Sequence, residues 1–154
     1  SRSADVFPIE ITDMQLVHRV LRGQDPVTGL LVSPHDLRRA LERELRGKLL
    51  RLRQGYAVYA GRPEQLTRAG VGSIGTIAVL LRAAVRLAEG QAPVATREAL
   101  HAAGRLMGFA ADPLARFFAL RGAKEGSMTR EDFERYLAAV ESAVRFIDQY
   151  HGDN

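Results

Sequence analysis

Two long helical patterns follow one another in the first two-thirds of this chain, and they constrain the fold more than any other feature. The first opens with the helix-start pair Ser33 and Pro34, after which leucine recurs at three- or four-residue spacing until Gly61 ends the pattern. Its length of about 27 residues corresponds to roughly 40 Å of helix. The second pattern runs from near Pro63 to Glu89. Long helices joined by short turns pack antiparallel, so we expect an all-α, up-and-down helical bundle.

Three shorter helical patterns complete the predicted bundle. One runs from Thr96, as its cap, to Met107, and the next is the segment "DPLARFFAL", with Asp112 as its cap. The last opens with Thr129 and Asp132, which are spaced as a capping box, and frays by Gly152. The sequence therefore predicts about five helices between residues 33 and 154.

The second long pattern carries three glycines, Gly70, Gly72 and Gly75, inside an apolar run. Each glycine costs a helix about 1 kcal/mol relative to alanine. We expect the close approach of another backbone to offset this cost, which would make the helix the buried centre of the bundle; the alternative is a break near Gly70 to Gly72. The apolar run ends at Arg82 and is shorter than the about 20 residues that span a bilayer, so no membrane association is expected.

The chain opens differently, with the alternating segment "FPIEITDM". Phe7, Ile9 and Ile11 are separated by single residues, which predicts one short β-strand. A lone strand cannot satisfy its own backbone hydrogen bonds, so this orphan strand predicts a sheet formed with an upstream segment. Because the first methionine is Met14, we interpret the chain as a fragment of a longer protein or as a processed chain.

Charge and composition narrow the function classes only partly. The formal net charge is +4 and 20 of the 22 basic residues are arginine, a balance that allows nucleic-acid or phosphate partners. Acidic residues are interspersed throughout, however, which favours an ordinary solvated surface. The chain has no cysteine, so it has no disulfide or thiolate metal site, and we expect a cytoplasmic location.

The four histidines do not indicate a metal site, because no two of them have the spacing of metal ligands. Arg145 and His151 are spaced like the ribonuclease motif of HEPN-type helical domains. In a chain this rich in arginine, one or two such spacings are expected by chance.

Three segments together resemble a known family. "VFPIEITDM", "VLRGQDP" and "ELRGKLLRLRQ" occur in the order found at the junction of bacterial nucleotidyltransferase-like proteins that have a polymerase-beta-type catalytic domain. The resemblance implies that Glu10 is the third metal-binding carboxylate of the intact protein, which would use Mg²⁺ and a nucleoside triphosphate. It also implies that residues 1–32 are a terminal strand and connector from an upstream catalytic domain, and that residues 33–154 are a substrate-binding or HEPN-like helical domain.

The chain also departs from this family. The family's Gly-Ser and Asp-x-Asp signature is absent, and Gly72-Ser73 has no acid pair at the required distance. Two-metal nucleotidyl transfer needs several carboxylates, and one cannot hold two Mg²⁺ ions. We therefore expect the chain itself to be non-catalytic and to have no cofactor of its own.

The candidate substrate-binding residues are a basic run on the first long helix. The resemblance implies that Arg46, Lys48, Arg51, Arg53 and Tyr56 help to bind nucleotide and a second substrate. At 100° per residue these side chains spread over more than one helix face. The alternative interpretation is a solvated face with pairs formed inside the helix.

Three functional hypotheses remain open. The first is a helical, substrate-binding-like domain of a nucleotidyltransferase-family protein, with the upstream catalytic domain and a nucleotide as its partners. The second is a dimerising helical interaction module without a small-molecule site, suggested by the apolar glycine-bearing helix. The third is a basic nucleic-acid-binding helical protein, the least expected of the three.

Overall fold

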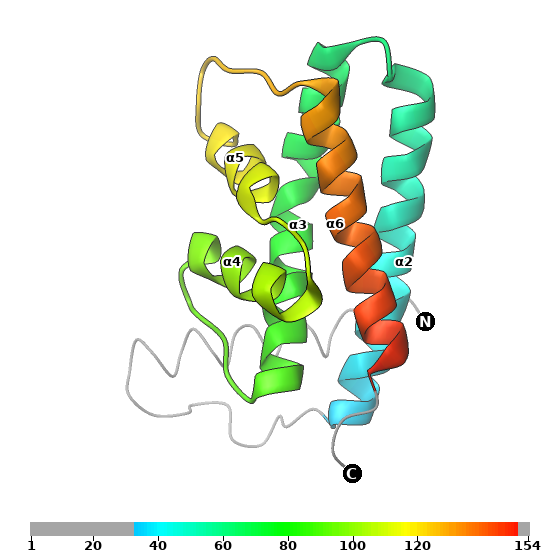
Figure 1. The fold of residues 1–154 in the computed structure, drawn as a ribbon, viewed down its shortest axis with the longest axis vertical. Helices are drawn as coiled ribbons and strands as arrows, with labels where there is room; N and C mark the ends of the chain where they lie inside the picture. Colours follow the sequence, from blue (N-terminus) through cyan, green and yellow to red (C-terminus); the bar gives the residue numbers. More distant parts are fainter. Residues whose placement is uncertain (1–32, 151–154) are drawn as a thin grey trace.

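The fold is built from five helices, and the computed structural model describes residues 33–150. This confirms the predicted all-α bundle. The predicted strand over residues 7–11, Glu10 within it and the connector to residue 32 lie outside the described residues. The helices are α2 (Pro34–Tyr59), α3 (Pro63–Glu89), α4 (Thr96–Met107), α5 (Asp112–Leu120) and α6 (Arg130–Gln149), as Figure 1 shows.

Helices α3 and α6 form the centre of the bundle. Among the described helices, each of them contacts all four others, whereas α2 contacts only α3 and α6. Helix α2 therefore lies at one edge, and the short helices α4 and α5 cover the opposite side (Figure 1). The layering agrees with the predicted central position of the apolar helix.

The chain runs in alternating directions through the bundle, and α4 and α5 together lead the chain from the end of α3 back to the start of α6. Helix α6 is antiparallel to α2, because Arg38 near the start of α2 donates a hydrogen bond to the Ile147 carbonyl near the end of α6. It is parallel to α3, because Met128 donates its backbone N–H to Thr67 and Tyr150 donates its hydroxyl to the Leu87 carbonyl. Helices α4 and α5 carry the chain back between these ends (Figure 1).

The predicted caps are confirmed at the long helices and wrong at the short ones. Ser33 accepts the Asp36 N–H at 3.1 Å, and Thr129 and Asp132 form a reciprocal capping box. Thr96 and Asp112, in contrast, are the first helical residues of α4 and α5 and do not cap them. The Thr96 hydroxyl instead accepts a hydrogen bond from the Arg82 guanidinium at 3.0 Å. The Asp112 carboxylate lies in the first turn of α5, where the helix dipole favours a negative charge.

An aromatic cluster fills the space between α5 and α6. Phe117, Phe133 and Tyr136 are fully buried, and their ring centroids are 5.1 to 6.3 Å apart. Burial raises the pKa of the Tyr136 phenol, and a hydrogen bond of 2.7 Å with the Ser73 hydroxyl satisfies its oxygen. This bond fixes the middle of α6 against the middle of α3.

Side chains approach Gly70 and Gly75, and nothing approaches Gly72, so the predicted close approach of another backbone is wrong. A Cβ at Gly70 would lie 2.9 Å from Cζ of Phe117 and closer still to two other ring atoms. At Gly75 it would lie 3.1 to 3.3 Å from the Arg121 guanidinium, and at Gly72 it would meet nothing within 4 Å. Helix α3 is continuous through all three positions, which excludes the predicted alternative of a break.

A buried arginine joins α3 to the segment that follows it. Arg82 is only 7% exposed, and its guanidinium donates to the carbonyls of Pro93 (3.2 Å) and Val94 (3.0 Å) as well as to Thr96. These bonds satisfy the buried charge and hold the α3–α4 connection against the bundle.

Helix α3 is long and apolar enough, by length and composition alone, to cross a membrane. The uninterrupted apolar run that ends at Arg82 is too short to span a bilayer, whereas the whole helix passes this test of length and composition. Half of its most apolar window is buried inside the bundle, and core helices of soluble proteins pass the same test.

Candidate functional site

The basic run of α2 does not converge on one site. Arg46, Arg53 and Tyr56 lie along the side of α2 that faces α6. Arg46 pairs with Asp148 at 2.6 Å, and Arg53 pairs with Glu141 at 2.7 Å. The Arg46 hydrogen bond is the main reason that the pKa of Asp148 is lowered. Two of the four predicted phosphate-binding cations are therefore already bound to carboxylates of the same chain.

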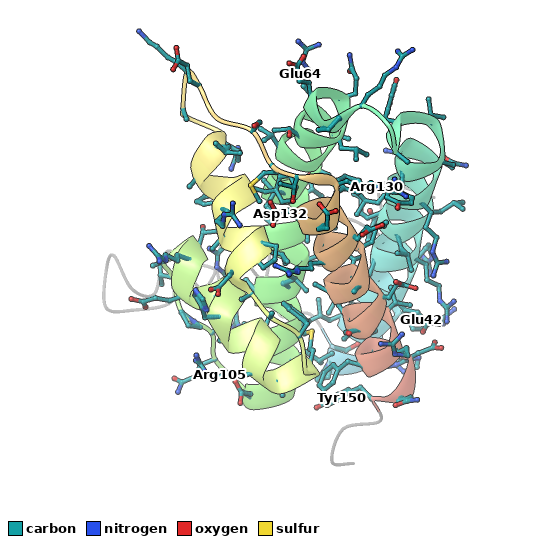
Figure 2. The ribbon with its side chains drawn as sticks, turned by 45° about the horizontal axis from the view of Figure 1, so that its top comes forward. Glu42, Glu64, Arg105, Arg130, Asp132 and Tyr150 are labelled. Carbon is teal, nitrogen blue, oxygen red and sulfur yellow. The ribbon has the colours of Figure 1, made fainter. Side chains whose placement is uncertain are left out.

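Tyr56 is held in a similar way at the upper end of the α2–α6 contact. Its hydroxyl donates a hydrogen bond to the Glu134 carboxylate and accepts one from Arg130 Nε at 3.1 Å. Its ring is stacked on Phe133, with centroids 6.1 Å apart. Figure 2 shows Arg130 between the upper ends of α2 and α6, and Glu42 beside the lower end of α6. The polar end of Tyr56 is thus occupied by two charged neighbours from α6.

The α2–α6 ion pairs follow a heptad register that was missed from the sequence. Arg46 and Arg53 are seven residues apart on α2, and Asp148 and Glu141 are seven residues apart on α6. Since two antiparallel helices keep their register over seven residues, the second pair repeats the first two turns away. The seven-residue spacing of Glu134, Glu141 and Asp148 was a signal in the sequence that predicts this partner helix for α2.

Lys48 and Arg51 lie elsewhere on α2, three residues apart and so on neighbouring positions of the helix surface. Lys48 is half-buried and Arg51 is exposed, and neither forms an ion pair with another described residue. For these two members of the basic run, a phosphate contact stays a prediction.

No metal centre is formed by the described residues, in which no group of three or more His, Asp or Glu side chains could hold an ion. Glu10, the metal ligand implied by the resemblance, lies outside residues 33–150, and so does His151. Its proposed companion Arg145 donates a hydrogen bond to the Ser142 hydroxyl at 3.2 Å. The two-metal and ribonuclease interpretations therefore stay predictions.

The outer face of α2 carries an uncharged ridge that the sequence interpretation did not single out. Leu50 is 57% exposed and Val58 is 69% exposed, and they are the large hydrophobic side chains that the described part of the chain leaves exposed. Both lie on the face of α2 opposite the buried leucines, and Leu50 belongs to a set on this face whose members are spaced alternately three and four residues apart. We call this set, together with Val58, the outer ridge: Gly47, Leu50, Gln54, Ala57, Val58 and Gly61.

The outer ridge is long, has a glycine at each end and is bordered by positive charge. It extends for about 21 Å from Gly47 in α2 to Gly61, which lies two residues beyond the end of α2 at Tyr59. A Cβ at either glycine would meet nothing within 4 Å. Arg46 and Arg53 border it on the α6 side, and Arg51 borders it on the other. Since α2 contacts no described helix except α3 and α6, no other described helix covers this face.

Comparisons of this chain with protein-family models, with curated proteins and with solved structures found no match. We therefore infer a function from the residues and contacts of this chain alone.

Proposed function

We propose that this chain is a helical interaction module that dimerises and has no small-molecule site within residues 33–150. The observation that carries the proposal is the outer ridge, where Leu50 and Val58 expose apolar surface on an uncharged helix face. Single exposed apolar residues are common, but two on one four-turn face, bordered by charge, have the composition of an interface core with a polar rim.

The occupied state of the basic run supports this proposal over a binding site for small anions. Arg46, Arg53 and Tyr56 would have to give up their contacts with Asp148, Glu141 and Glu134 before they contacted a phosphate. These contacts instead attach α6 to α2 and so keep α2 straight along the outer edge of the bundle. A rigid, pre-formed helix face loses little conformational entropy when it binds a partner.

The direct test is sedimentation velocity of the full chain from about 1 µM to about 1 mM, which covers binding free energies of about −8 to −4 kcal/mol. We expect a concentration-dependent shift from monomer to dimer. The double variant Leu50→Gln/Val58→Gln should remain a monomer over this range. The control is Ala119→Gln, a change at an exposed position of α5, which does not contact α2. A wild-type chain that stays monomeric throughout refutes the proposed function.

A second candidate function is the substrate-binding-like domain implied by the resemblance, and the neighbouring side chains of Lys48 and Arg51 favour it. On this hypothesis the chain contributes a phosphate contact to a nucleotide held by an upstream catalytic domain. Calorimetric titration with ATP tests it against the variant Lys48→Gln/Arg51→Gln, with Arg53→Gln as the control for a cation already paired with Glu141. Equal heats from all three proteins would exclude a phosphate contact at these residues.

A further inference from the structure

Five of the six residues of the outer ridge are placed symmetrically about Gln54, and the exception is Ala57, whose counterpart at the matching distance is Arg51. Leu50 and Val58 lie four residues before and after Gln54, and Gly47 and Gly61 lie seven residues before and after it. If two copies of α2 cross antiparallel at Gln54, each Leu50 meets the partner's Val58 and each Gly47 meets the partner's Gly61. A self-complementary patch of this kind is what a two-fold symmetric interface requires.

We propose that the outer ridge binds a second copy of this chain, with the two α2 helices antiparallel and the two-fold axis at Gln54. This inference rests on the proposed function and specifies its interface. The size of the side chains supports the crossing: glycine at both ends lets the backbones come close, and the large hydrophobic side chains occupy the space on either side of the axis. The two Gln54 amides meet at the axis, and a polar residue in such a seam fixes the register.

The charges bordering the ridge favour the antiparallel over the parallel arrangement. In a parallel pair, flanking residues about five positions apart face each other, so Arg46 would lie beside the partner's Arg51 twice in the dimer. Arg46 is already paired with Asp148, but Arg51 has no ion-pair partner among the described residues, so the chain offsets only one of the two charges at each of these contacts. In the antiparallel pair, Arg51 instead lies beside the partner's Ala57 and Val58.

The antiparallel arrangement brings one pair of like charges together, Arg53 and the partner's Arg53. Each of these guanidinium groups is already paired with Glu141 at 2.7 Å. Each Arg53 therefore reaches the interface with its own counter-charge, which reduces the repulsion between the two copies of Arg53. The ion pairs between α2 and α6 thereby lower a charge penalty in the dimer.

Disulfide trapping tests the geometry, because the chain has no cysteine of its own. Gln54→Cys lies on the axis and should crosslink with itself under mild oxidation. Leu50→Cys alone should not, since two copies of position 50 are about 12 Å apart along the antiparallel axis, beyond the about 7 Å limit for Cα atoms joined by a disulfide. A mixture of Leu50→Cys and Val58→Cys should form the mixed disulfide in preference to either homodimer. Ala119→Cys is the control for random collision.

The outcomes separate the interface from the function. The mixed disulfide together with the Gln54→Cys crosslink supports the antiparallel interface. A fast homodisulfide of Leu50→Cys overturns the orientation and leaves dimerisation intact. A dimer in sedimentation whose ridge cysteines crosslink no faster than Ala119→Cys overturns the inference but not the proposed function. A monomer in sedimentation overturns both.

Discussion

Gly70 and Gly72 offer the sharpest test of the packing inside α3. Both lie in the middle of the same helix, two residues apart, so replacement by alanine brings the same gain in helix propensity at each. Their surroundings differ: a Cβ at Gly70 would press into the Phe117 ring, whereas a Cβ at Gly72 would meet nothing within 4 Å. Phe117 is fully buried and lies against Phe133 and Tyr136, so its ring has little room to move away.

The expected changes in the free energy of unfolding follow from helix propensity and from packing against Phe117. Gly72→Ala should stabilise the protein by about 0.5–1 kcal/mol, because only the propensity and unfolded-state terms change. Gly70→Ala gains the same amount but pays for overpacking, which costs about 1–3 kcal/mol in a well-packed core. Because the added methyl group lies well inside contact distance of three ring atoms, we expect the upper half of that range. The two variants should therefore differ in free energy of unfolding by about 2–3 kcal/mol.

Urea denaturation monitored by circular dichroism measures this difference, provided that both variants unfold with the same denaturant dependence as the wild type. For a chain of this size, about 2–4 °C of melting temperature per kcal/mol gives an independent check. The double variant Gly70→Ala/Phe117→Leu measures the coupling energy between these two positions. Because leucine is smaller than phenylalanine, Gly70→Ala should be at least about 1 kcal/mol less destabilising in the Phe117→Leu background than in the wild type. If Gly70→Ala and Gly72→Ala are equally stable, Phe117 does not pack on Gly70 and the explanation of this glycine is wrong.

Three further predictions concern single contacts. Thr129→Ala removes the side-chain half of the α6 capping box and should cost about 1 kcal/mol in urea denaturation, whereas Thr129→Ser should cost little. Burial alone would raise the pKa of Asp132, but hydrogen bonds from Thr129 and the nearby Arg116 lower this pKa overall. The stabilising effect of the Asp132 carboxylate is therefore complete above pH about 4 and is lost as the pH falls through the lowered pKa. The difference in free energy of unfolding between wild type and Asp132→Asn should shrink between pH 7 and pH 2.5, and a constant difference would contradict this. A double-mutant cycle on Arg53 and Glu141 should give a coupling of about 0.2–1 kcal/mol, because both side chains are partly exposed, and a value above about 2 kcal/mol would show that the pair is more important to stability than its exposure implies.

The long helices could be predicted from the sequence because their signals are local. Ser33 and Gly90 mark helix ends through contacts with residues a few positions away, and the sequence contains both partners of each contact. The short helices were predicted with less accurate starts because their first turns are fixed by distant residues. Thr96 looked like a cap, but its hydroxyl is used by Arg82, fourteen residues earlier.

The functional residues were harder to predict because their role depends on which helix packs beside them. Arg46 and Arg53 form a basic run in the sequence and an ion-pair seam in the structure, and the difference is made by carboxylates nearly a hundred residues later. The outer ridge was overlooked for the opposite reason. Leu50 looks like one more leucine of the apolar stripe, and only the position of α3 and α6 shows that it faces outward.

The place of α6 at the centre of the bundle has a consequence for how the protein is made. This helix is synthesised after the other described helices, yet it contacts each of them and supplies the carboxylates that pair with Arg53 and Tyr56. During translation, α2 and α3 can form a hairpin early, but their faces toward α6 stay uncovered until α6 leaves the ribosome. At about 5–20 residues per second, the roughly 60 residues that separate α3 from the end of α6 leave apolar surface open for several seconds. A nascent chain that pauses in this interval is the form of this protein most in need of a chaperone.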